Sequence, residues 1–139
     1  VVSPEMITED LLKLFTVIQD KGKTITIVIH ANHANELTDE VAITMKQLQR
    51  NGIMLISQSV MLQGINDDFK TLANLMRRFI AVGIKPYYLH QLDFARGTSH
   101  FRVKEEKAIA LIRELRLKLS GICVPVLIQE IPHGKKPLF

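Results

Sequence analysis

The 139-residue sequence predicts an α/β fold built from parallel strands and crossover helices. Stretches with a helical hydrophobic period alternate along the chain with short β-branched runs. The strand runs are almost continuously apolar, which favours burial on both faces of a parallel sheet. The order α-β-α-β-α-β-α-β implies right-handed crossovers. Since a closed barrel needs about eight strands, four indicate a small open sheet or a piece of a larger barrel.

Four helices are predicted where apolar residues recur on one face between a capping signal and a glycine. They cover 7–22, 38–52, 67–83 and 104–121, with Thr8 and Thr38 as caps and a glycine as each stop. The inward face of the first helix is expected to carry Leu11, Leu14 or Phe15, and Ile18. That of the second is expected to carry Val41, Met45 and Leu48, and that of the third Phe69, Leu72, Leu75 or Met76, and Phe79.

The four strands are predicted at 24–30, 53–60, 85–91 and 124–131. Cys123 lies in the run "ICVPVLI" and is interpreted as a buried strand residue rather than a nucleophile. A single cysteine excludes an intrachain disulfide and any metal site built from several thiolates.

The charge balance of 18 basic and 14 acidic residues is mildly basic and dispersed, so a nucleic-acid groove is not favoured. No stretch approaches the roughly 20 apolar residues of a membrane helix, and the first residues do not resemble a signal peptide. We therefore expect a soluble protein of the reducing cytoplasm. The start at Val1 instead of Met indicates a truncated or processed polypeptide.

Polar residues gather where the predicted strands end, and all five histidines lie at or after a strand's carboxyl end. In parallel α/β folds chemistry collects at that rim. Asp93 and Glu130 are two carboxylates there, and as a pair they could hold a cationic amine or be surface charges. Lys135 is either a solvated charge or a reactive amine.

Two further segments of the rim hold polar residues. The histidines and acid of "HANHANE" could bind a metal, or could serve as turn and cap groups. Asn66 in "GIND" is expected to cap the following helix.

Several segments, in order and spacing, resemble the carboxyl half of the lysine 2,3-aminomutase family: "HANHANE", "SQSVMLQGIND", "KPYYLHQLD", "GTSHFRV" and "SGICVPVLIQEIPHGKKPL". The phrases "NHANE", "TLANL" and "PYYLH" look like the branch that makes (R)-β-lysine for modifying elongation factor P. This resemblance implies a radical S-adenosylmethionine isomerase that also uses pyridoxal phosphate. It also implies about half of a partial TIM-type barrel, with residues 1–139 as its carboxyl-terminal portion, ending in the loop of the cofactor lysine.

By the same resemblance, the site residues take specific roles. Lys135 is the lysine that binds pyridoxal phosphate, with Lys136 the lesser option in "KKP". Asp93 matches the acid that binds the substrate's side-chain ammonium, and Glu130 lies near the second such acid, in a shorter loop. His30 and Gln58 match positions close to S-adenosylmethionine. The substrate would be L-lysine, whose amino group shifts between adjacent carbons after a radical removes a hydrogen.

The sequence departs from the family in one respect. The three cysteines that bind the family's four-iron–four-sulfur cluster, spaced C-x3-C-x2-C, are absent, and Cys123 lies where the family has no ligand. The chain holds no metal ligand by this comparison, and alone it is expected to be inactive.

Three other functions remain open: a module that binds ligand without turnover, a nucleic-acid-binding α/β domain, and an aminomutase for another amino acid. A half-barrel would also expose sheet edges and apolar faces, so self-association is expected.

Overall fold

The computed structural model describes residues 3–93 and 97–139, and a five-stranded sheet organises them. Its strands lie side by side in chain order, and the first four are parallel as predicted. They are β1 (Thr26–His30), β2 (Met54–Met61), β3 (Lys85–Gln91), β4 (Val126–Ile131) and β5 (Gly134–Pro137).

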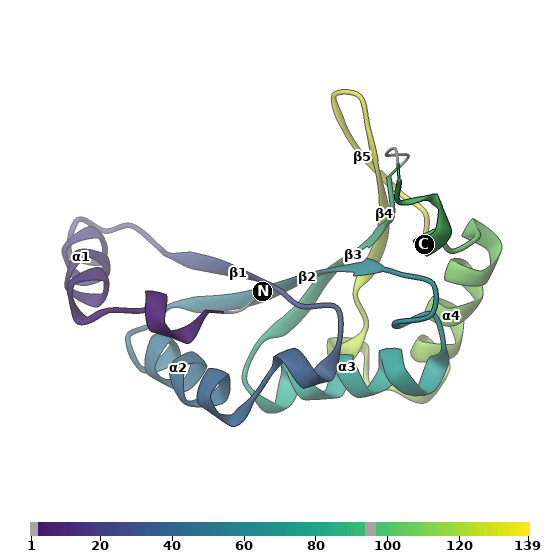
Figure 1. The fold of residues 1–139 in the computed structure, drawn as a ribbon. Coiled ribbons are helices and arrows are strands. Elements are labelled where there is room, and N and C mark those ends of the chain that lie inside the picture. The colour runs from purple at the N-terminus through teal and green to yellow at the C-terminus, as the bar shows by residue number, and fades with distance from the viewer. Residues whose placement is uncertain (1–2, 94–96) are drawn as a thin grey trace.

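Four helices alternate with the parallel strands: α1 (Glu9–Asp20), α2 (Asp39–Arg50), α3 (Phe69–Ala81) and α4 (Glu105–Lys118). Figure 1 shows α2, α3 and α4 on one side of the sheet, α1 beyond the β1 edge, and the β4–β5 hairpin standing away from the helices. Short 3-10 helices occupy Pro4–Met6, Ala34–Glu36, Ser99–Phe101 and Gly121–Cys123.

Only one face of the sheet is packed against helices, so the expectation of burial on both faces is wrong for the described residues. In β2, Leu55, Ser57, Ser59 and Met61 are buried, whereas the residues between them are exposed or half-buried. We call the second face, which carries Met54, Gln58 and Val60, the open face. The strand sequences are almost continuously apolar because the open face also carries apolar side chains, among them the exposed Val28, Met54 and Val126.

The helix caps are largely those that the sequence predicts. The hydroxyls of Thr8 and Thr38 accept hydrogen bonds from the backbone N–H groups of Leu11 (3.2 Å) and Val41 (3.3 Å). The expectation that Asn66 caps α3 is wrong: the carboxylate of Asp68 accepts from the Thr71 N–H at 3.0 Å.

The last helix is shorter than predicted. It ends at Lys118 because Leu119 adopts an extended conformation (φ −120°, ψ 157°), and Gly121 begins a separate 3-10 turn. Cys123 ends that turn and is half-buried against the core, so its assignment to a buried strand is also wrong.

The predicted inward faces of α2 and α3 are confirmed, including both Leu75 and Met76. In α1 the ambiguous position is resolved, because Phe15 packs against the core and Leu14 is exposed. The remaining core joins the sheet to the helices through fully buried side chains such as Leu89, Ile112 and Leu115.

The final strand, β5, was not predicted. The segment "GKKP" is expected from sequence to be a loop, but it pairs antiparallel with β4, with Glu130 opposite Lys135 and Ile131 opposite Gly134. Pro132 and His133 form the two-residue connection, and His133 has a positive φ of 70°. A proline followed by a left-handed residue suits a type II turn, although glycine is the usual second residue.

Across the described residues, none of the helices is long and apolar enough to cross a membrane.

Candidate functional site

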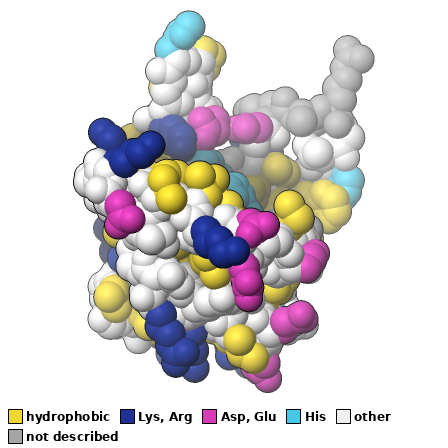
Figure 2. All heavy atoms as spheres, turned by 90° about the vertical axis from the view of Figure 1, so that its left-hand side faces the viewer, with side chains coloured by type: hydrophobic (Ala, Val, Ile, Leu, Met, Phe, Trp, Pro, Cys, Tyr) yellow, Lys and Arg dark blue, Asp and Glu magenta, His cyan; other side chains and the backbone are white. Residues whose placement is uncertain are grey.

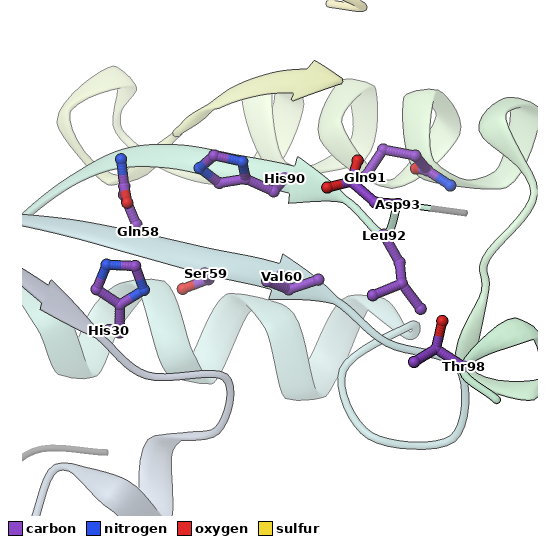
Figure 3. A pocket seen from close by; sticks show the side chains of 9 residues that line it. All are labelled: His30, Gln58, Ser59, Val60, His90, Gln91, Leu92, Asp93 and Thr98. Atoms are coloured by element: carbon purple, nitrogen blue, oxygen red, sulfur yellow. The ribbon is translucent and has the colours of Figure 1, made fainter. Parts of the chain in front are cut away.

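A cavity of about 190 Å³ lies at the carboxyl ends of β2 and β3, on the rim where the sequence predicts a site. Figure 3 shows side chains from neighbouring strands turned toward it, with helices behind the sheet. The lining residues are His30, Gln58, Ser59, Val60, His90, Gln91, Leu92, Asp93 and Thr98. Three of the five predicted site residues, His30, Gln58 and Asp93, therefore meet in one cavity.

The other two predicted residues lie on the hairpin beside this cavity. The Nζ atom of Lys135 is 3.7 Å from Oε1 of Glu130, and it lies 4.8 Å from the centroid of the Tyr88 ring. The same Glu130 oxygen is 3.3 Å from Nδ1 of His90. The hairpin thus brings an amine, a carboxylate and an imidazole into contact on the open face.

Strand alternation separates the two neighbouring lysines. Lys135 faces Glu130 across the hairpin, whereas Lys136 is paired with Gln129 and projects to the opposite face. Of the two, Lys135 is the lysine on the side of His90 and the cavity.

The surroundings of His90 favour its neutral form by lowering its pKa. Burial lowers the pKa of the imidazole, and the charge of Lys135 lowers it further, while Glu130 acts in the opposite direction. The side chain is 15% exposed, and Nε2 is buried without a hydrogen-bond partner among the described residues.

A buried polar network fixes the loops that follow β1 and β2. The amide of Asn66 donates to the carbonyls of Asn32 and Val60, both at 2.9 Å, and its oxygen accepts from the Leu62 N–H at 2.8 Å. The hydroxyl of Ser59 donates to the Ala31 carbonyl at 2.6 Å. This network holds the strand ends that carry His30 and Gln58.

The metal interpretation of "HANHANE" gains no support. Nδ1 of His33 accepts from the Asn35 N–H at 3.2 Å, and Glu36 accepts from the N–H groups of Asn32 and His33. These are the turn and cap roles, and no group of three or more potential metal ligands exists in residues 3–93 and 97–139.

Only two of the five histidines at the carboxyl ends of the strands line the cavity. His30 and His90 line the cavity, while His33 caps a turn, His100 lies in a 3-10 helix, and His133 sits in the hairpin turn. Sequence reasoning missed Tyr88 as a site residue. Tyr88 lies two residues before His90, and this spacing in a strand places both side chains on the open face. The same alternation does not extend to the residues before Tyr88, because the pairing of β2 with β3 shifts its register between Ser57 and Gln58.

The chain is similar over its whole length to curated L-lysine 2,3-aminomutases. It is 41% identical over 139 residues to that of Buchnera aphidicola and 41% identical over 140 residues to that of Escherichia coli. The enzyme of Clostridium subterminale is 34% identical over 134 residues, which are 96% of this chain. By sequence, the chain is therefore similar to one part of curated L-lysine 2,3-aminomutases.

The chain spans about 40% of the length of the first two of these relatives, and 31% of the Clostridium enzyme. No protein-family model matches it.

A solved structure shares the fold of this chain. A radical SAM methyltransferase from Sphaerobacter thermophilus matches 88% of this chain with a TM-score of 0.60, over 38% of its own length. At 13% identity that match concerns the fold alone. The mostly parallel sheet with helices on one face thus matches part of the fold of that methyltransferase.

Proposed function

We propose that residues 1–139 form the carboxyl-terminal portion of a lysine 2,3-aminomutase, an isomerase that converts L-lysine to β-lysine. We further propose that the β-lysine serves the modification of elongation factor P. The proposal is supported by similarity over the whole chain and, above all, by the position of Lys135. That lysine presents its amine on the open face, against Glu130 and Tyr88 and beside the cavity.

The residues present suit the covalent attachment of pyridoxal phosphate. The side chain of Lys135 is 39% exposed, so its amine can reach an aldehyde, and the Tyr88 ring offers an aromatic surface next to it. Glu130 is close enough to pair with the amine of Lys135 until the cofactor binds. The nine cavity-lining residues include no lysine or arginine, so they provide no cation for the phosphate.

The other predicted site residues lie in different parts of the cavity or beside it. Asp93 supplies a carboxylate for the substrate ammonium, and Glu130 lies behind His90 on the same face. His30 and Gln58, paired across β1 and β2, form the side of the cavity assigned to S-adenosylmethionine.

An iron–sulfur cluster does not fit the residues of this chain. The sequence has a single cysteine, Cys123, on a 3-10 turn beside the core. A four-iron cluster needs about three or four thiolates, so its ligands would come from another part of the protein. We therefore predict no aminomutase turnover by this chain alone.

When bound, the cofactors would supply the radical and the delocalisation that an amino shift needs. The protein's contribution is to orient the substrate and exclude water. A cavity of about 190 Å³ is smaller than the roughly 300–1,000 Å³ of ligand pockets, so this chain would provide one wall of the site.

Borohydride reduction of the chain with pyridoxal phosphate, followed by peptide mass mapping, tests the cofactor lysine. We expect one stoichiometric label on Lys135. The Lys135→Ala variant should lose the label, and the neighbouring Lys136→Ala variant should keep it. Label on Lys136, or scattered over many lysines, would contradict the assignment.

A chimera tests the activity. The chain replaces the matching segment of the E. coli L-lysine 2,3-aminomutase, which it resembles at 41% identity. We expect the chimera to form β-lysine from L-lysine, and Lys135→Ala to abolish the product while Lys136→Ala does not. A folded chimera that binds iron yet makes no β-lysine would argue against the proposed reaction.

A further inference from the structure

The orientation of the His90 ring defines what its free nitrogen can do. Nδ1 lies 3.3 Å from Oε1 of Glu130. A carboxylate oxygen accepts hydrogen bonds and donates none, so this contact favours the tautomer with the proton on Nδ1. In a neutral imidazole Nε2 is then an acceptor, and here it is buried without a partner in the described part of the chain. A buried acceptor left empty is costly, which points to a ligand that donates to it.

The surrounding cavity has the same preference for donors. Asp93 is the one carboxylate among the nine lining residues, which include no lysine or arginine. Gln91 adds a second buried acceptor, because its amide nitrogen donates to the Val103 carbonyl while its oxygen has no partner in the described structure. The end of the cavity near β3 therefore suits a cation with several N–H donors, which an ammonium group provides.

Resting on the function proposed above, we propose that His90 is a specificity-determining residue, whose Nε2 accepts a hydrogen bond from the substrate's side-chain ammonium while Asp93 binds its charge. Glu130 does not line the cavity and acts through His90, by fixing the proton on Nδ1. The two-carboxylate receptor expected from sequence thus becomes one carboxylate and one imidazole, with the second carboxylate behind the ring.

The charges around His90 are compatible with this role. Glu130 and Asp93 raise the pKa of its ring, whereas Lys135 and His30 lower it. Burial is the largest influence and lowers the pKa of the ring, which favours the neutral form that can accept a hydrogen bond from an ammonium.

Nitrogen NMR of the ¹⁵N-histidine-labelled chain with pyridoxal phosphate tests the proposal directly. Without amino acid, His90 should show a protonated Nδ1 and an unprotonated Nε2. Titration with L-lysine should move the Nε2 resonance in a saturable way. L-norleucine, which lacks the ammonium, should leave it in place. An Nε2 resonance that stays unmoved at saturating L-lysine, or that moves equally with L-norleucine, would overturn the proposal.

Substitutions give an independent measure. His90→Phe keeps a ring but removes the acceptor, and should weaken L-lysine binding about 10-fold or more relative to L-norleucine. His90→Gln retains an amide acceptor and should recover part of that preference. His100→Phe, at an exposed position outside the cavity lining, is the matched control and should bind like the parent. An unchanged preference in a folded His90→Phe protein would refute the role of the ring.

The two proposals can fail separately. Labelling of Lys135 by borohydride does not require His90 to accept from the substrate. A labelled Lys135 together with an unresponsive His90 would leave the cofactor site standing and remove only this inference.

Discussion

At the scale of single residues, His90 should make stability depend on pH. Burial lowers its pKa in the folded chain below the ordinary value of about 6.5 in the unfolded chain. The folded state therefore binds fewer protons, and the stabilisation is complete above about pH 6.5 and is lost as the pH falls through the folded pKa. We expect His90→Phe to reduce the drop in Tm between about pH 7 and pH 5, measured by circular dichroism. If His100→Phe reduces it equally, His90 is not the responsible group.

Asn66 is the residue whose role the sequence misplaced. It is fully buried and makes three hydrogen bonds that join the ends of β1 and β2. Asn66→Ala leaves those backbone groups unpaired, so the free energy of unfolding should fall by about 2–4 kcal/mol in urea titrations.

The matched control for that change is Asn74→Ala. Asn74 is exposed on α3, so its replacement should alter the free energy of unfolding by less than about 0.5 kcal/mol. Similar losses in both variants would show that the Asn66 network does not stabilise the rim.

At the scale of elements, the sequence predicted most of the fold because its signals are local. Thr8 and Thr38 cap by short-range hydrogen bonds, and β3 has the predicted bounds Lys85–Gln91. The cap of α3 could not be decided locally. Asn66 and Asp68 both have suitable side chains, and a buried contact with Asn32 from another loop draws Asn66 away. The hairpin was missed because its turn has histidine where glycine is usual.

That histidine offers a test of the hairpin. His133 has a φ of 70°, a left-handed conformation in which a side chain costs about 1–2 kcal/mol. His133→Gly removes that cost but gains unfolded-state entropy, so a net stabilisation of up to about 1 kcal/mol is expected. His133→Val should destabilise the chain, since β-branched residues avoid this region. Thermal unfolding of both variants measures the difference, and equal shifts in the same direction would contradict the turn.

In the candidate site too, some features could be predicted from the sequence and others depend on contacts between distant parts of the chain. That polar residues cluster on one rim could be predicted from the chain order of strands and loops, and His30, Gln58 and Asp93 do line one cavity. The contact of Glu130 with Lys135 could not, because it depends on an antiparallel fifth strand.

At the scale of the whole molecule, one side of the sheet lacks a covering layer within the described structure. Val28, Met54 and Val126 are 39%, 53% and 39% exposed on the open face, and β1 forms an edge of the sheet. Figure 2, which views the molecule from the α1 side, shows further hydrophobic side chains among charged ones, with the hairpin projecting beyond the body. Apolar side chains on a sheet face and an open edge both favour association.

We therefore expect the chain to self-associate with rising concentration, and the open face to be responsible. Met54→Lys places a charge on that face, so burying it against another copy becomes unfavourable and the monomer should predominate. Leu117→Lys is the matched control, because Leu117 is 86% exposed on α4 and lies off the sheet. Sedimentation velocity over a concentration series measures both variants. A parent chain that stays monomeric throughout, or a Leu117→Lys variant that dissociates as fully as Met54→Lys, would show that the open face is not the surface of association.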